Sequence, residues 1–70
     1  MTAEAVYFVD ADLRGAKLAN SVLTLSNFEA ADLANADLTG ANLLEANLLL
    51  ANLYEALLTG ARMPDNTVHP

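Results

Sequence analysis

The sequence contains no cysteine and no tryptophan, and only three basic residues stand against nine acidic ones. Without cysteine, the chain can form neither a disulfide nor a thiolate metal site. The net charge of −6 disfavours direct binding to nucleic acid or to an anionic membrane, because both carry negative charge themselves. Asp, Asn or Glu interrupts every apolar run before it reaches the length of about 18 residues that a membrane-spanning helix needs.

Two further absences bear on location and chemistry. No basic segment followed by an apolar run opens the chain, so we expect no signal peptide and a cytoplasmic location, which the lack of cysteine also fits. The single histidine, His69, lies in the C-terminal tail, far along the chain from Ser21 and Ser26, so neither serine has an evident base to activate it. We therefore expect no enzymatic activity, no cofactor and no bound metal.

What the sequence does contain is a five-residue repeat, clearest over residues 31–55 as ADLAN, ADLTG, ANLLE, ANLLL and ANLYE. The same frame extends over residues 6–65, which makes twelve units. Their third residues are Leu, Phe or Met, and their first residues are Ala, Ser or Val. Such self-similarity at a fixed period is the signature of a repeat architecture.

A period of five suits neither a helix nor a plain strand. On a helix, five residues turn the chain by about 500°, so the leucines would circle the axis and define no face. Within one unit, however, the first and third residues share one side of a short extended piece, and the second residue points the other way. If the last two residues turn the chain each time, the repeats wind into a β-solenoid with an apolar interior.

These units resemble the pentapeptide-repeat family, whose pattern is A(D/N)LXX, over residues 6–65. The resemblance implies an all-β fold, a right-handed quadrilateral parallel β-helix with four units per coil, in which the first and third residues of each unit point inward. Three coils then span residues 6–25, 26–45 and 46–65. We expect residues 1–5 to form an N-terminal cap or a frayed end. Residues 66–70 are expected to form a tail, similar to the one that ends many cyanobacterial members, and so the natural C-terminus.

Four units per coil place residues twenty apart above one another. Phe8 should therefore lie beneath Phe28, with Leu48 above them, as an aromatic column in the core. On the outside, other columns predict specific contacts. They are an Asn27–Asn47 amide ladder, a Lys17–Asp37 ion pair, an Asp12–Asp32 repulsion that Arg14 relieves, and a corner of Asn20, Gly40 and Gly60 with positive φ.

The C-terminal end of such a solenoid would expose unpaired backbone groups. Pro64 is expected to remove a donor from the ladder at this edge, which suits a final coil. Val68 keeps the repeat frame and is expected to lie over Leu48. This cover is thin, because the tail is short.

Several outward positions in the later repeats are apolar where polar residues are expected. A contiguous exposed apolar patch usually marks a contact surface, although scattered exposed leucines are ordinary and the tail could fold over these. The candidate protein-contact residues are Leu44, Leu49, Leu50, Tyr54 and Leu57.

Two functions follow as hypotheses. The first is a structural or protein-interaction module of unknown biochemical role, which forms a homodimer through its C-terminal coil or binds an unidentified protein. The alternative comes from the family resemblance, since some members are DNA-mimic inhibitors of DNA gyrase, a type II topoisomerase. That role needs a long rod with continuous acidic ladders, whereas three coils measure only about 15 Å along the axis. The sequence itself does not identify a partner.

Overall fold

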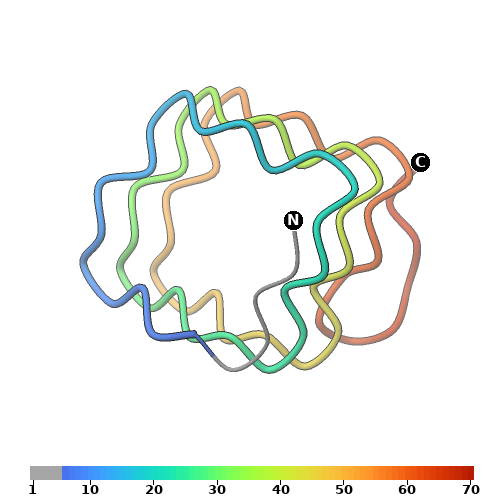
Figure 1. Cartoon of the computed structure of the whole chain (residues 1–70), viewed down its shortest axis with the longest axis horizontal. Helices are drawn as coiled ribbons and strands as arrows, with labels where there is room; N and C mark the ends of the chain where they lie inside the picture. The colour runs from blue at the N-terminus through green and yellow to red at the C-terminus, as the bar shows by residue number, and fades with distance from the viewer. Residues whose placement is uncertain (1–5) are drawn as a thin grey trace.

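The computed structural model describes residues 6–70, and over this range the chain winds into a right-handed quadrilateral β-helix of three coils (Figure 1). Coil one spans residues 6–25, coil two 26–45 and coil three 46–65, as the period predicts. The described range contains no helix, and β-pairing between coils is confined to single-residue parallel bridges between second residues twenty apart. The bridged pairs are Tyr7–Asn27, Asp12–Asp32, Lys17–Asp37, Val22–Asn42, Asn27–Asn47, Asp32–Asn52, Asp37–Leu57 and Asn42–Arg62.

Three backbone hydrogen bonds per unit join successive coils. The third residue donates to the second residue of the next coil, as Leu13 N does to Asp32 O at 2.8 Å. That second residue donates back to the first, as Asp32 N does to Ala11 O at 2.9 Å. The fifth residue donates to the fourth residue above it, as Gly15 N does to Ala34 O at 3.0 Å. Each coil therefore satisfies backbone N–H and C=O groups of its neighbour, and these hydrogen bonds hold the coils together although no coil contains a regular strand.

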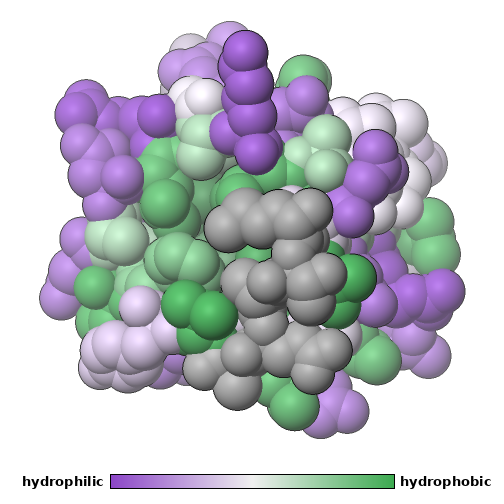
Figure 2. Space-filling view, in the orientation of Figure 1, coloured by the Kyte–Doolittle hydropathy of each residue, from purple (hydrophilic) through white to green (hydrophobic). Residues whose placement is uncertain are grey.

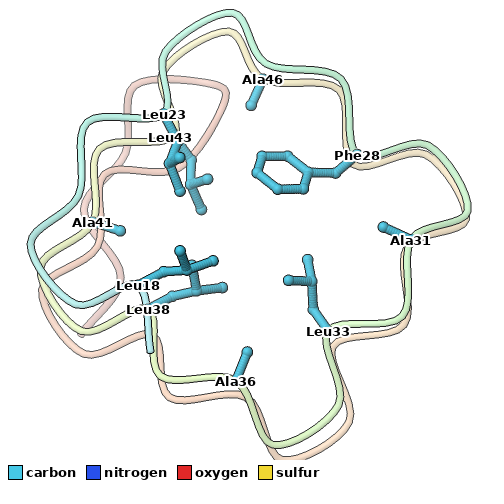
Figure 3. Close-up of a cluster of buried hydrophobic side chains, with 10 residues drawn as sticks. All are labelled: Leu18, Leu23, Phe28, Ala31, Leu33, Ala36, Leu38, Ala41, Leu43 and Ala46. Atoms are coloured by element: carbon cyan, nitrogen blue, oxygen red, sulfur yellow. The ribbon is translucent and has the colours of Figure 1, made fainter. Parts of the chain in front are cut away.

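The core is a column of side chains along the axis of the coils (Figure 3). Third-position leucines from different sides point toward one another, and small first-position alanines lie between them. The predicted aromatic column is confirmed, because the rings of Phe8 and Phe28 stack with centroids 4.9 Å apart and an interplanar angle of 10°. The fully buried large residues of this core are Leu23, Phe28, Leu33, Leu38 and Leu43.

Every corner of the coil is the same β-turn. The third carbonyl of one unit accepts from the first N–H of the next, as Leu33 O does from Ala36 N at 3.0 Å. The fifth residue has a positive φ, between 56° and 73°, in each of the eleven units that end at Asp10 to Gly60. The predicted corner of Asn20, Gly40 and Gly60 does have positive φ, but so does every other fifth residue up to Gly60. Gly40 has a second requirement, since a Cβ there would meet Oδ1 of Asn20 in the coil below.

The recurrent Asp or Asn at the second position stabilises these turns. Its side-chain oxygen accepts from the N–H of the fourth residue, as Asp32 Oδ1 does from Ala34 N at 3.2 Å. Asn27 and Asn47 make the same bond to their own turns, at 3.0 Å each. Although these two residues are stacked, neither amide bonds to the other among the described contacts, so the predicted amide ladder is wrong. The outward Asx residue therefore holds the corner, as in an Asx-turn.

The tail departs from the repeat. In the unit 61–65, positive φ falls one residue late, on Asn66 at 72°, and the chain reverses as in a hairpin that ends in a left-handed residue. Val68 then bridges antiparallel to Arg62. The expectation that Val68 lies over Leu48 is therefore wrong, because the reversal places the tail beside the preceding unit.

The role expected for Pro64 is also wrong, because fourth residues donate nothing to the ladder. Their N–H groups face their own turn, and only their carbonyls join coils, as when Glu45 N donates to Pro64 O at 3.0 Å. Proline at this position instead pre-sets the φ that the second residue of the turn needs.

These turns generate a prediction about alanine. Ala30 and Ala19 are both exposed, but Ala30 has φ 57° whereas Ala19 is not among the residues with positive φ. Ala30→Gly should raise the free energy of unfolding by about 0.5–1 kcal/mol, because it relieves a left-handed L-residue. The control Ala19→Gly should lower it by a similar amount. Urea unfolding measures both, and a destabilised Ala30→Gly variant would refute this turn geometry.

Candidate protein-contact surface

The five candidate contact residues lie on four sides of the coil. Leu44 belongs to coil two and is half-buried, so it contributes little to an exposed surface. The other four belong to coil three and are exposed: Leu49 by 61%, Leu50 by 78%, Tyr54 by 68% and Leu57 by 56%. Because the chain turns a corner every five residues, these four do not form a flat patch. They surround the end formed by coil three, and we call them the C-terminal rim.

Inside the rim, the apolar interior is incompletely covered. Leu48, Leu53 and Leu58 are only partly buried, whereas the residues below them in coil two, Phe28, Leu33 and Leu38, are fully buried. No fourth coil packs on this layer in the described chain, and the tail pairs with the side that contains Arg62 and with Gly60 at the corner before it. An apolar interior and an apolar rim thus meet at one end of the solenoid.

The backbone at this end is also unpaired on the two sides that do not adjoin the tail. In coil two, Phe28 N and Leu33 N donate to coil three at 2.7 and 2.8 Å. The equivalent groups of coil three, Leu48 N and Leu53 N, make no backbone hydrogen bond within residues 6–70. Unpaired edge groups beside exposed apolar side chains are the features by which a β-edge pairs with another chain.

Sequence reasoning missed other exposed apolar residues. Tyr7 is 75% exposed, Leu25 59% and Val68 57%. Tyr7 could have been found by the same signal as Leu57, since both stand at a second position where Asp or Asn belongs. These residues lie outside coil three. Figure 2 shows the end formed by coil one, opposite the C-terminal rim, where apolar side chains also gather toward the middle and hydrophilic ones form much of the periphery.

The charged columns show one predicted contact and lack another. Arg14 pairs with Asp12 at 2.8 Å and lies 3.9 Å from Asp32, so it relieves their repulsion as predicted. Hydrogen bonds from the Arg14 side chain hold the pKa of Asp12 at about 2, below its ordinary 3.8. Lys17 lies below Asp37, but among the described residues they form no ion pair within 4.0 Å. The pKa of Asp37 is lowered chiefly by hydrogen bonds from Thr39, with the Lys17 charge a smaller cause.

The two serines are part of the core. Ser26 is fully buried, and its Oγ accepts from Val6 N at 3.2 Å. Ser21 is 1% exposed, and its Oγ has no hydrogen-bond partner in the described chain. His69, the one possible base, lies exposed in the tail with Nδ1 2.9 Å from Pro70 O. Neither serine thus has the neighbour that nucleophilic catalysis needs.

Residues 6–70 offer no other site for a small ligand. No pocket and no group of three or more metal-ligating side chains occurs among them. Nothing helical in this range has the length and apolar character to cross a bilayer. The end of coil three holds most of the exposed large apolar side chains among the described residues.

Comparison with known proteins gives concordant results. The family model described as pentapeptide repeats matches residues 7–44 and 31–65, with eight copies. No curated protein matches the chain. The crystal structure of Rfr23, a pentapeptide repeat protein from the cyanobacterium Cyanothece 51142, aligns with a TM-score of 0.88 and 35% identity, covering 99% of this chain and 47% of Rfr23.

A second similar structure is HetL, a pentapeptide repeat protein involved in heterocyst differentiation regulation in Nostoc sp. strain PCC 7120. It aligns with a TM-score of 0.41 and 29% identity, covering 97% of this chain and 43% of HetL. The present chain thus spans less than half the length of each of these two relatives.

The serines give a matched pair of predictions. Ser21→Ala should raise the free energy of unfolding by about 1 kcal/mol, because it removes a buried hydroxyl without a partner. Ser26→Ala should lower it by about 1 kcal/mol, because Val6 N loses its acceptor. Chemical denaturation of the two variants and the parent decides this. Equal effects of the two substitutions would contradict the hydrogen bonding described for Ser21 and Ser26.

Acid should weaken the Asp12–Arg14 contact. Because folding depresses the pKa of Asp12, its contribution to stability is full above about pH 4 and is lost as the pH falls toward about 2. Asp12→Asn keeps an acceptor for the turn but has no carboxylate to protonate. Thermal melting should therefore show a smaller loss between pH 4 and 2 for this variant than for the parent. An unchanged pH profile would argue against the contact.

Proposed function

Because this chain belongs to the pentapeptide-repeat family, we propose that it is a non-enzymatic protein-interaction module whose contact surface is the C-terminal rim. The family match and the similarity to Rfr23 support the solenoid as a scaffold for such a surface. The described residues offer no catalytic constellation that competes with this proposal.

The observation that carries the proposal is the concentration of exposed apolar residues in coil three. Leu49, Leu50 and Tyr54 stand in columns whose coil-two members are Glu29, Ala30 and Ala34. The outward side chains in these columns therefore become larger and more apolar from coil two to coil three. Exposed apolar residues that cluster around one end are typical of a contact surface.

The partner that we propose first is a second copy of the chain. A strand edge would satisfy the unpaired backbone groups at Leu48 and Leu53, and each copy carries such an edge itself. A contact between identical ends closes as a two-fold dimer, in which each copy covers the same edge of the other. An unidentified protein that presents a strand edge is the other candidate.

The distribution of acids does not favour a DNA-mimic inhibitor of gyrase. Within residues 6–70, no outward column carries an acid in all three coils, and the Asp12–Asp32 column ends at Asn52. Arg14 lies against the same two carboxylates and offsets their charge. The chain measures 24 × 23 × 21 Å, so it lacks the elongated form of a duplex. Inhibition of gyrase in a supercoiling assay would revive this alternative.

The rim can be tested with two matched leucines. Leu50 and Leu25 are both exposed fifth residues, with φ 61° and 63°, but Leu25 lies in coil one. Over a concentration series in sedimentation velocity, we expect the parent to self-associate and Leu49→Lys/Leu50→Lys to be monomeric. Leu25→Lys should behave like the parent. A parent that remains monomeric at every concentration excludes a second copy as partner, and a double variant that still associates excludes the rim.

A further inference from the structure

The tail shows how an antiparallel strand pairs with the edge of a coil. At the unit 61–65, Ala61 O and Met63 N face the open end. His69 N donates to Ala61 O at 2.8 Å, and Met63 N donates to Thr67 O at 2.7 Å. The two bonds flank the bridge between Arg62 and Val68. A first-position carbonyl and a third-position N–H thus form an acceptor–donor pair, which an antiparallel strand satisfies with two hydrogen bonds.

In the described chain, the same carbonyl and N–H are vacant on the three other sides of coil three, within residues 46–50, 51–55 and 56–60. Ala46 O and Leu48 N form one such pair, and Ala51 O and Leu53 N form the next; none of the four makes a backbone hydrogen bond within the described residues. The following side, residues 56–60, adjoins the tail, because Gly60 N donates to His69 O at 2.8 Å. The freely accessible edge is therefore residues 46–55.

We propose that this edge pairs antiparallel with the same edge of a second copy, with Asn47 opposite the partner's Asn52. The inference rests on the proposed function and specifies its contact. In this register Leu48 N donates to the partner's Ala51 O, and Ala46 O accepts from the partner's Leu53 N. The two-fold axis repeats both bonds, so both first-position carbonyls and both third-position N–H groups of each edge are satisfied. A register with Asn47 opposite the partner's Asn47 would satisfy only half of them.

The side chains suit this register. Inward-facing Leu48 lies opposite the partner's Ala51, and Ala46 lies opposite the partner's Leu53, so a large residue meets a small one in each pair. At the axis, Leu49 lies opposite the partner's Leu50, which covers the two most exposed leucines of the rim. Few charges intervene, because 46–55 contains Glu55 alone among charged residues.

The register can be tested with two variants that differ at one residue. Asn47→Asp/Asn52→Lys places Asp opposite the partner's Lys twice, and Asn47→Lys/Asn52→Lys places Lys opposite Lys twice. Lys17 shows that lysine is accepted at a second position, and Lys at position 52 would lie above Asp32 in both variants. Circular dichroism at low concentration checks that both monomers fold. Sedimentation equilibrium at low and at high salt measures the dimer Kd.

We expect the Asp/Lys variant to dimerise at least about tenfold more tightly than the Lys/Lys variant at low salt, because two attractive cross-strand pairs replace two repulsive ones. High salt should reduce this difference. Equal Kd values, or tighter binding of the Lys/Lys variant, would overturn the strand pairing, as would two variants and a parent that are all monomeric. If Leu49→Lys/Leu50→Lys abolishes association while these two variants bind equally, the rim remains the contact and only the pairing is rejected.

Discussion

The left-handed residue at the end of each unit is the constraint on which this fold depends. A fifth residue with positive φ turns the chain so that the next alanine and leucine again face the axis, and four such turns return the chain above its start. Only then do residues twenty apart come into register for the bonds between coils. Several corners have Leu, Ala or Glu in this conformation, which costs roughly 1–2 kcal/mol per residue. Burial of the core column and pairing of the backbone must offset that cost.

A ladder built this way is satisfied inside and unsatisfied at its ends. The middle coil has partners on both sides, so its leucines are fully buried and its amides are bonded. Coil three has a neighbouring coil on one side only, and the tail completes only the part from Gly60 to Met63. The remaining edge concentrates unpaired groups, uncovered leucines and the rim in one place. The candidate contact surface thus arises because no further coil covers coil three in the described chain.

The period alone predicts most of the architecture. Counting by twenty from the sequence correctly places Phe8 on Phe28 and Arg14 beside Asp12 and Asp32, because stacking in a solenoid is strictly periodic. The tail could not be predicted in this way, because its reversal depends on a single shift of positive φ from residue 65 to Asn66. The turn-stabilising role of the second-position Asp and Asn could have been predicted from the repeat, because Asp and Asn recur just before each turn. The candidate contact residues were predicted from their apolar character at outward positions, but only the coil geometry shows that four of them lie on three sides of the last coil and that Leu44 does not.

Amide hydrogen exchange of the dilute monomer tests the central claim, that backbone pairing between coils holds the fold and stops at residues 46–55. Leu33 N and Leu53 N occupy the same position in successive coils, but Leu33 N donates to Asn52 O and Leu53 N has no backbone partner within residues 6–70. The account predicts slow exchange at Leu33, with Leu38 and Leu43 similar, and fast exchange at Leu53 and Leu48. Equal protection at Leu33 and Leu53 would contradict it.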